Sequence, residues 1–124
     1  MNVEERSAKV KIGKKEYELV LTTRATKEIA KRYGGLANLG EKLSKSENFE
    51  EALSEIIWLV TTLANQSILI YNYENPNSKK PLLTEELVEI YTAPSDLAIY
   101  KDAITEALLK GTKREVESTA SKNV

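Results

Sequence analysis

The segment from Phe49 to Tyr71 limits most strongly what this chain can fold into. Its apolar residues recur at helical spacing, and around Ile56–Leu63 they cover nearly the whole circumference of a helix. A helix that is apolar on all sides must be surrounded by other elements. Asn48, followed three positions later by Glu51, has the capping-box pattern that starts a helix. We therefore predict a long central helix over residues 49–71, with the rest of the chain packed around it.

The end of this segment allows a second interpretation. Several of its residues are β-branched, so a strand near Ser67–Tyr71 is an alternative. The helical interpretation explains more positions of the whole segment, and we prefer it. The longest apolar stretch, Ile56–Leu63, is interrupted by Thr61 and Thr62 and is far shorter than the ~20 residues that cross a bilayer. We expect no contact with a membrane.

Two alternating runs near the N-terminus predict a β-hairpin over residues 8–21, because Gly13 and Lys14 between them suit a two-residue turn. If the turn joins Ile12 to Lys15, apolar pairs share one face and Lys–Glu pairs share the other. A lone hairpin is marginally stable, so helices should cover the apolar face. The predicted pairs are Val10 with Tyr17, Ala8 with Leu19, Lys11 with Glu16, and Lys9 with Glu18.

Four shorter helices are predicted from caps and periodicity. Threonines stand before two of them as N-caps, and glycines follow two of them as stops. Gly40 lies inside one of these segments and costs about 1 kcal/mol relative to Ala, which predicts a short or irregular helix there. The segments are 23–33, 36–43, 85–91 and 96–110, with caps at Thr22 or Thr23 and Thr84, and stops at Gly34 and Gly111.

These elements predict an α+β, mostly α fold. A two-stranded antiparallel hairpin at the N-terminus should pack on a bundle of four to five helices with a long central helix. The chain has 124 residues, 41% of them hydrophobic, which suits one compact core. We predict a single domain over residues 1–111, and we expect the polar residues 112–124 to form a disordered tail.

The chain contains no Cys and no His, which excludes thiol nucleophiles, disulfides, Cys/His zinc sites and His-dependent triads. Adjacent acids at Glu50–Glu51 and Glu85–Glu86 stand at predicted helix starts, where the helix dipole favours negative charge. Neighbouring helix residues point in different directions, so these pairs do not face one another across a cleft. We expect a protein without enzyme activity, cofactor or metal.

The charges are balanced and mixed along the chain. Lys and Arg number 18 against 19 acids, which gives a net charge of -1. A dedicated nucleic-acid binder normally shows a clear basic face. Basic residues do share the helix at 23–33, but a solvated helix face explains them better than a DNA-binding patch. The first residues lack the pattern of a secretory signal, so we expect a cytoplasmic protein.

A loop rich in Asn, Pro and Lys is predicted over residues 72–81. Aromatic and apolar residues flank this loop, and two interpretations of them remain open. They either anchor the loop on the core, which we favour, or form an exposed patch for a partner protein. The candidate protein-binding residues are Tyr71, Tyr73, Leu82 and Leu83.

Several short segments resemble the tail assembly chaperones of long-tailed bacteriophages and prophages of Gram-positive bacteria. The resemblance extends over most of the chain and consists of packing and turn signatures rather than catalytic motifs. The segments that carry it are Lys11–Leu19, Leu21–Ala25, Tyr33–Leu36, Asn48–Ala52, Trp58–Leu59 and Ala64–Gln66.

The resemblance implies a protein that binds the long, helical tape measure protein, keeps it soluble in the bacterial host, and helps recruit tail tube proteins. Such a chaperone leaves the finished particle and is absent from the mature virion. The sequence leaves open whether the chain forms a homo-oligomer. A small DNA-binding regulator that uses short helices as a helix-turn-helix is the alternative hypothesis.

Overall fold

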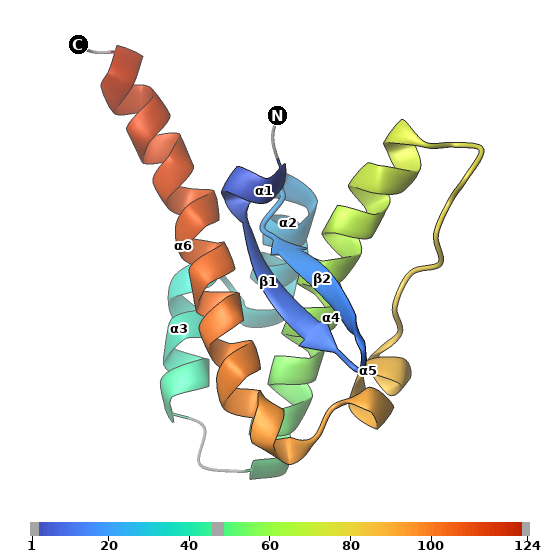
Figure 1. Ribbon diagram of the computed structural model, residues 1–124. Coiled ribbons are helices and arrows are strands. Elements are labelled where there is room, and N and C mark those ends of the chain that lie inside the picture. Colours follow the sequence, from blue (N-terminus) through green and yellow to red (C-terminus); the bar gives the residue numbers. More distant parts are fainter. Residues whose placement is uncertain (1–2, 46–48, 123–124) are drawn as a thin grey trace.

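The computed structural model describes residues 3–45 and 49–122, with side chains for residues 5–42 and 49–112. Its architecture is the predicted one: an N-terminal antiparallel hairpin packed against helices, one of them long and central (Figure 1). The elements are α1 (Val3–Arg6), β1 (Ser7–Ile12), β2 (Lys15–Val20), α2 (Thr23–Tyr33), α3 (Leu36–Lys45), α4 (Phe49–Glu74), α5 (Glu85–Tyr91), η1 (Pro94–Asp96) and α6 (Leu97–Lys122).

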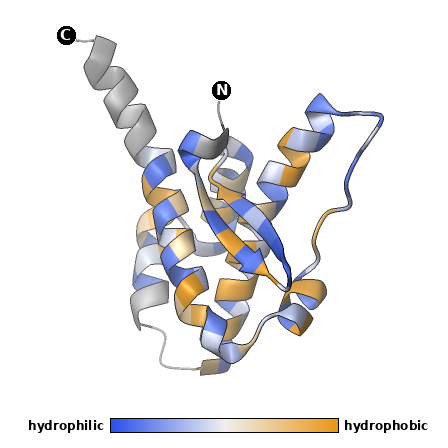
Figure 2. Cartoon of the chain, in the orientation of Figure 1, coloured by the Kyte–Doolittle hydropathy of each residue, from blue (hydrophilic) through white to orange (hydrophobic). Residues whose placement is uncertain are grey.

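The hairpin has the predicted register. Ile12 pairs with Lys15 across the Gly13-Lys14 turn, and the four predicted pairs are present: Val10 with Tyr17, Ala8 with Leu19, Lys11 with Glu16, and Lys9 with Glu18. Ser7 and Val20 form a further pair. The alternation of hydrophilic and hydrophobic residues along both strands can be followed in Figure 2. Gly13 has a φ of +67°, a left-handed conformation that favours glycine in this turn.

The predicted helices are all present, and α2 and α5 have the predicted bounds. The helix α4 extends from Phe49 to Glu74, so residues 67–71 are helical and the alternative strand there is wrong. The proposed cap of this helix, Asn48, lies outside the described residues. The single-turn helix α1 was not predicted, because four residues are too few to show a periodicity.

The core is built on α4. The hairpin covers one side of this helix, with β2 beside it, and α6 lies across β1 and α4 (Figure 1). Leu19 of β2, Leu59 and Leu63 of α4, and Ile104 of α6 are completely buried. Each element therefore buries an apolar face that the others would leave in water.

By length and composition, α4 is apolar enough to cross a membrane. More than half of its most apolar window, 56%, is buried inside the fold. The central helix of a compact core passes the same test, because it is surrounded by protein rather than by lipid. The apolar character of α4 is accounted for by this burial.

Hydrogen bonds cap both ends of α2, and the N-terminal cap also bonds to α4. The Ala25 N–H donates to Thr22 Oγ1 at 3.0 Å, and the Thr22 hydroxyl donates to Oε1 of Gln66 on α4 at 2.7 Å. At the other end, Gly34 is left-handed, with φ +86°, and its N–H donates to the carbonyl oxygen of Ala30 at 2.7 Å. The cap therefore both starts the helix and attaches it to the core.

A charged cluster ties the C-terminal end of α2 to α4. Arg32 Nε lies 3.2 Å from Oε2 of Glu55, the Tyr33 hydroxyl donates to the same carboxylate, and the guanidinium lies 4.5 Å from the Trp58 ring centroid. Burial alone would raise the pKa of Glu55, but the hydrogen bonds from Tyr33 and Arg32 outweigh it, and this pKa lies below its usual value. Burial raises the pKa of Tyr33, with a further contribution from its bond to Glu55.

The last helix does not end where it was predicted to end. We expected a stop at Gly111 and a disordered tail over 112–124, but α6 continues through this glycine to Lys122. A close contact explains the glycine at this position: a Cβ at Gly111 would lie 2.8 Å from Cβ of Leu21. Gly111 therefore lets α6 approach the end of the hairpin and does not terminate the helix.

Two glycine substitutions test this explanation. Gly111→Ala should lower the free energy of unfolding by about 1–3 kcal/mol, because the new methyl group collides with Leu21. Gly40→Ala on α3 is the matched control: its Cβ would meet nothing within 4 Å, so stability should rise by up to about 1 kcal/mol. Urea unfolding measures both, and a stabilised Gly111→Ala protein would show that the contact is unimportant.

The charged cluster predicts a pH dependence. A carboxyl whose pKa is lowered on folding contributes stability above its usual pKa of 4.5, and this stability is lost as the pH falls through the lower, folded-state pKa. Glu55→Gln should therefore be less stable than the natural protein at pH 7, by about 1–3 kcal/mol. The gap should shrink at pH 3. Urea unfolding at both pH values measures it, and an equal gap at both would contradict the assignment.

Candidate protein-binding grooves

The four residues predicted to bind a partner do not form one patch. Leu83 belongs to the core, with 8% of its surface exposed, whereas Tyr73 on the last turn of α4 is 92% exposed. Tyr71 is half-buried and Leu82 is exposed. The anchoring interpretation therefore holds for Leu83, and the structure brings Tyr71, Leu82 and Leu83 together in the wall of one groove, without Tyr73.

This groove is bounded by residues 80–83, a segment outside the helices and strands, which we call the strap. Two asparagines of α4 hold it by paired hydrogen bonds. The Asn65 amide donates to the carbonyl oxygen of Leu83 at 2.9 Å, and its oxygen accepts the Leu83 N–H at 2.7 Å. Asn72 forms the same pair with the backbone of Lys80, at 2.9 and 2.7 Å. The strap is thus attached to α4 at both of its ends.

The spacing of the two asparagines matches the strap. Seven residues of helix separate Asn65 from Asn72, a rise of about 10.5 Å. Three residues separate Lys80 from Leu83, and an extended chain covers about 10 Å in three residues. The chain turns back after α4, so the order is reversed: the later asparagine holds the earlier strap residue (Figure 1). The two asparagines therefore make the backbone hydrogen bonds to the strap that a neighbouring strand would otherwise make.

The first groove, which we call the β2 groove, lies between β2, α4 and the strap. Its volume is about 790 Å³, within the range of ordinary ligand pockets. The ammonium of Lys80 lies 4.2 Å from the ring centroid of Tyr71. The lining residues are Lys15, Glu16, Tyr17 and Glu18 of β2, Ser67, Ile68 and Tyr71 of α4, Lys80, Pro81, Leu82 and Leu83 of the strap, and Leu87 of α5.

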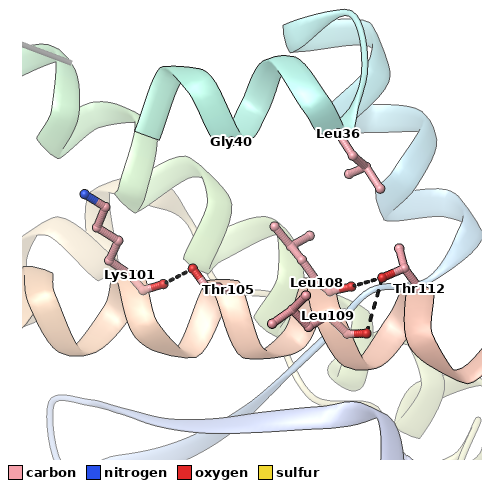
Figure 3. A pocket seen from close by; sticks show the side chains of 7 residues that line it. All are labelled: Leu36, Gly40, Lys101, Thr105, Leu108, Leu109 and Thr112. Carbon is pink, nitrogen blue, oxygen red and sulfur yellow. Dashed lines mark hydrogen bonds between the residues drawn. The ribbon is translucent and has the colours of Figure 1, made fainter. Parts of the chain in front are cut away.

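A second groove lies between α3 and α6 and has a volume of about 340 Å³ (Figure 3). Leu36 and Gly40 line it from α3, and Lys101, Thr105, Leu108, Leu109 and Thr112 line it from α6. The hydroxyls of Thr105 and Thr112 donate to carbonyl oxygens of their own helix, at 2.9 and 3.0 Å. The surface of this groove is largely apolar, and Leu109 is 61% exposed.

The α3–α6 groove was not among the surfaces predicted from the sequence, although two of its residues carry a signal of it. Gly40 was treated only as a cost to the helix, whereas in the structure no atom lies within 4 Å of the position its Cβ would take. Leu109 lies outside the buried stripe of α6 that includes Tyr100, Ile104 and Ala107. A glycine, which has no side chain, beside an exposed leucine such as Leu109 is typical of a surface that another helix can approach closely.

Among the described residues, no group of three or more Cys, His, Asp or Glu side chains lies close enough to hold a metal ion. Comparison of the chain with models of known families, with curated proteins and with solved structures found no match.

The strap is tested by removing one asparagine. Asn65→Ala should lower the free energy of unfolding by about 1–3 kcal/mol, because the N–H and the carbonyl of buried Leu83 lose their partners. Amide exchange at Leu83 should rise at the same time. Asn77→Ala in the preceding loop is the control, since Asn77 is exposed. If the two substitutions have equal effects, the strap is held by other contacts.

Proposed function

We propose that this protein is a non-catalytic tail assembly chaperone that binds the tape measure protein and helps recruit tail tube subunits. The family resemblance, spread over most of the chain, supports the biological setting. The observation that carries the binding mode is the α3–α6 groove, which fits a helical segment of the partner (Figure 3).

The walls of this groove suit a third helix. Both walls are themselves helices, and Leu36, Leu108 and Leu109 provide apolar side chains between which the ridges of an incoming helix can pack. Gly40 has no side chain in the way, so the incoming helix can approach α3 closely. Lys101 lines the same groove and would favour an acidic residue on the partner beside the apolar ones.

The need for such a chaperone follows from the physics of the partner. A long helical rod exposes apolar seams until the tail tube encloses it, and large exposed apolar patches cause aggregation. A small protein that covers one seam keeps the rod soluble and is displaced when tube subunits cover the same surface. The groove would contact the apolar seam of the partner along one helix only. Because this contact is small, the complex is reversible.

The proposal predicts the effect of a charge placed in the α3–α6 groove. Leu109→Glu should abolish co-purification of the chain with the tape measure protein encoded by the same phage or prophage, and this partner should become insoluble when the two are co-expressed. Ile99→Glu is a matched control on the same helix, because Ile99 is 60% exposed, against 61% for Leu109, and does not line the groove. Circular dichroism verifies that both variants are folded.

Failure of the natural protein to bind or solubilise the tape measure protein would overturn the proposal. Equal loss of binding in the Leu109→Glu and Ile99→Glu variants would show that the partner does not bind specifically in the α3–α6 groove. Salt-dependent binding to DNA, in place of protein binding, would support the alternative of a small transcriptional regulator.

A further inference from the structure

The second proposal concerns the β2 groove and stands on a different surface from the α3–α6 groove. In the two-stranded sheet, β2 pairs with β1 along one edge only. Within the described part of the chain, no backbone hydrogen bond joins residues 15–18 to any element other than β1. Residues 15–18 line the β2 groove, so the unpaired N–H and C=O groups of this outer edge are available there to another chain.

The strap lies across the groove from this edge but does not pair with it. The backbone of Lys80 and Leu83 is bonded to Asn72 and Asn65 of α4. This attachment holds the strap in place as the opposite wall and keeps it from closing onto β2. The strap therefore leaves the outer edge of β2 without a backbone partner.

The two faces of the hairpin define which side chains a third strand should carry. On the inner side, Ile68, Tyr71 and Leu87 line the groove and require apolar residues. On the outer side, β2 presents Glu16 and Glu18, which pair with Lys11 and Lys9 of β1. A residue added beside these glutamates on the outer side should be basic, because opposite charges directly across a sheet are favourable and like charges are not.

We propose that the outer edge of β2 binds an extended partner segment in which basic and apolar residues alternate. The segment adds a third strand to the hairpin, with its apolar residues toward Ile68 and Leu87 and its basic residues beside Glu16 and Glu18. The chain itself shows that β2 selects this pattern: β1, on the opposite edge, reads Lys9-Val10-Lys11-Ile12. The exposed length of edge, residues 15–18, accommodates a segment of about four residues.

The test uses a fluorescein-labelled peptide that repeats the Lys-Val-Lys-Ile pattern, with the full-length protein and fluorescence anisotropy. Binding is expected, together with slower amide exchange on β2. A peptide with Glu in place of each Lys should not bind. A peptide with the same side chains, but with alternate backbone nitrogens methylated on the edge that would pair, should not bind either, because it cannot hydrogen-bond to the strand.

Variants of the protein test whether Glu16 and Glu18 select basic residues in the bound segment. Glu16→Gln combined with Glu18→Gln should weaken binding of the basic peptide by about 2- to 30-fold, the effect of two cross-strand ion pairs. Glu28→Gln combined with Glu89→Gln changes the net charge equally at exposed positions outside the groove and should leave affinity unchanged. Thermal unfolding verifies that each protein is folded.

Three results would overturn the proposal. Equal binding of the methylated peptide would mean that the groove binds side chains without adding a strand. Equal binding of the acidic peptide would show that Glu16 and Glu18 do not select basic residues. The chain could instead dimerise through β2, which would be seen as concentration-dependent sedimentation that the peptide cannot reverse. In that case a second copy of the chain, and not a partner segment, would occupy the outer edge of β2. Because Leu109 lines the α3–α6 groove and not the β2 groove, the Leu109→Glu protein should bind the peptide normally, which separates this test from that of the proposed function.

Discussion

The contact between the hairpin and α4 is the interaction on which the rest of the structure depends. A two-stranded sheet is marginally stable alone, and a helix that is apolar on nearly all sides cannot remain in water. Packing of the hairpin against α4 buries Leu19 and Leu63 completely, which stabilises the hairpin and removes this side of the helix from water. The remaining helices then cover the sides of α4 that the hairpin leaves open, as Figure 1 shows for α6.

Polar residues on α4 determine where its neighbours lie. Within the described residues, no buried side-chain nitrogen or oxygen lacks a hydrogen-bond partner. Three polar side chains on this largely apolar helix bond to neighbouring elements: Glu55 to α2, Gln66 to the cap of α2, and Asn65 to the strap. Since an unmatched polar group costs free energy when buried, these contacts favour one arrangement of the elements over others. The same helix therefore supplies the apolar core and the positions of its surroundings.

The two grooves follow from this arrangement and differ in what they can recognise. The α3–α6 groove offers leucine side chains between helices, which suits another helix. The β2 groove offers a strand edge above an apolar floor, which suits an extended segment. In the assembly setting that we propose, the first surface would hold a helical rod and the second would hold a flexible segment of a partner, so the chain would have two independent contacts.

The sequence by itself determined the local structure. The pairing of the hairpin, the bounds of α2 and α5, and the central position of α4 follow from alternation, helical periodicity and caps, all of which act between residues that are close along the chain. Only the tertiary structure decided the roles of Gly111 and Asn65. Gly111 lies inside a helix, where the absence of a Cβ leaves room for Leu21, and Asn65 bonds to the backbone of Leu83, 18 residues away. A glycine has the same sequence pattern whether it ends a helix or admits a neighbour, so only the long-range contact distinguishes the two.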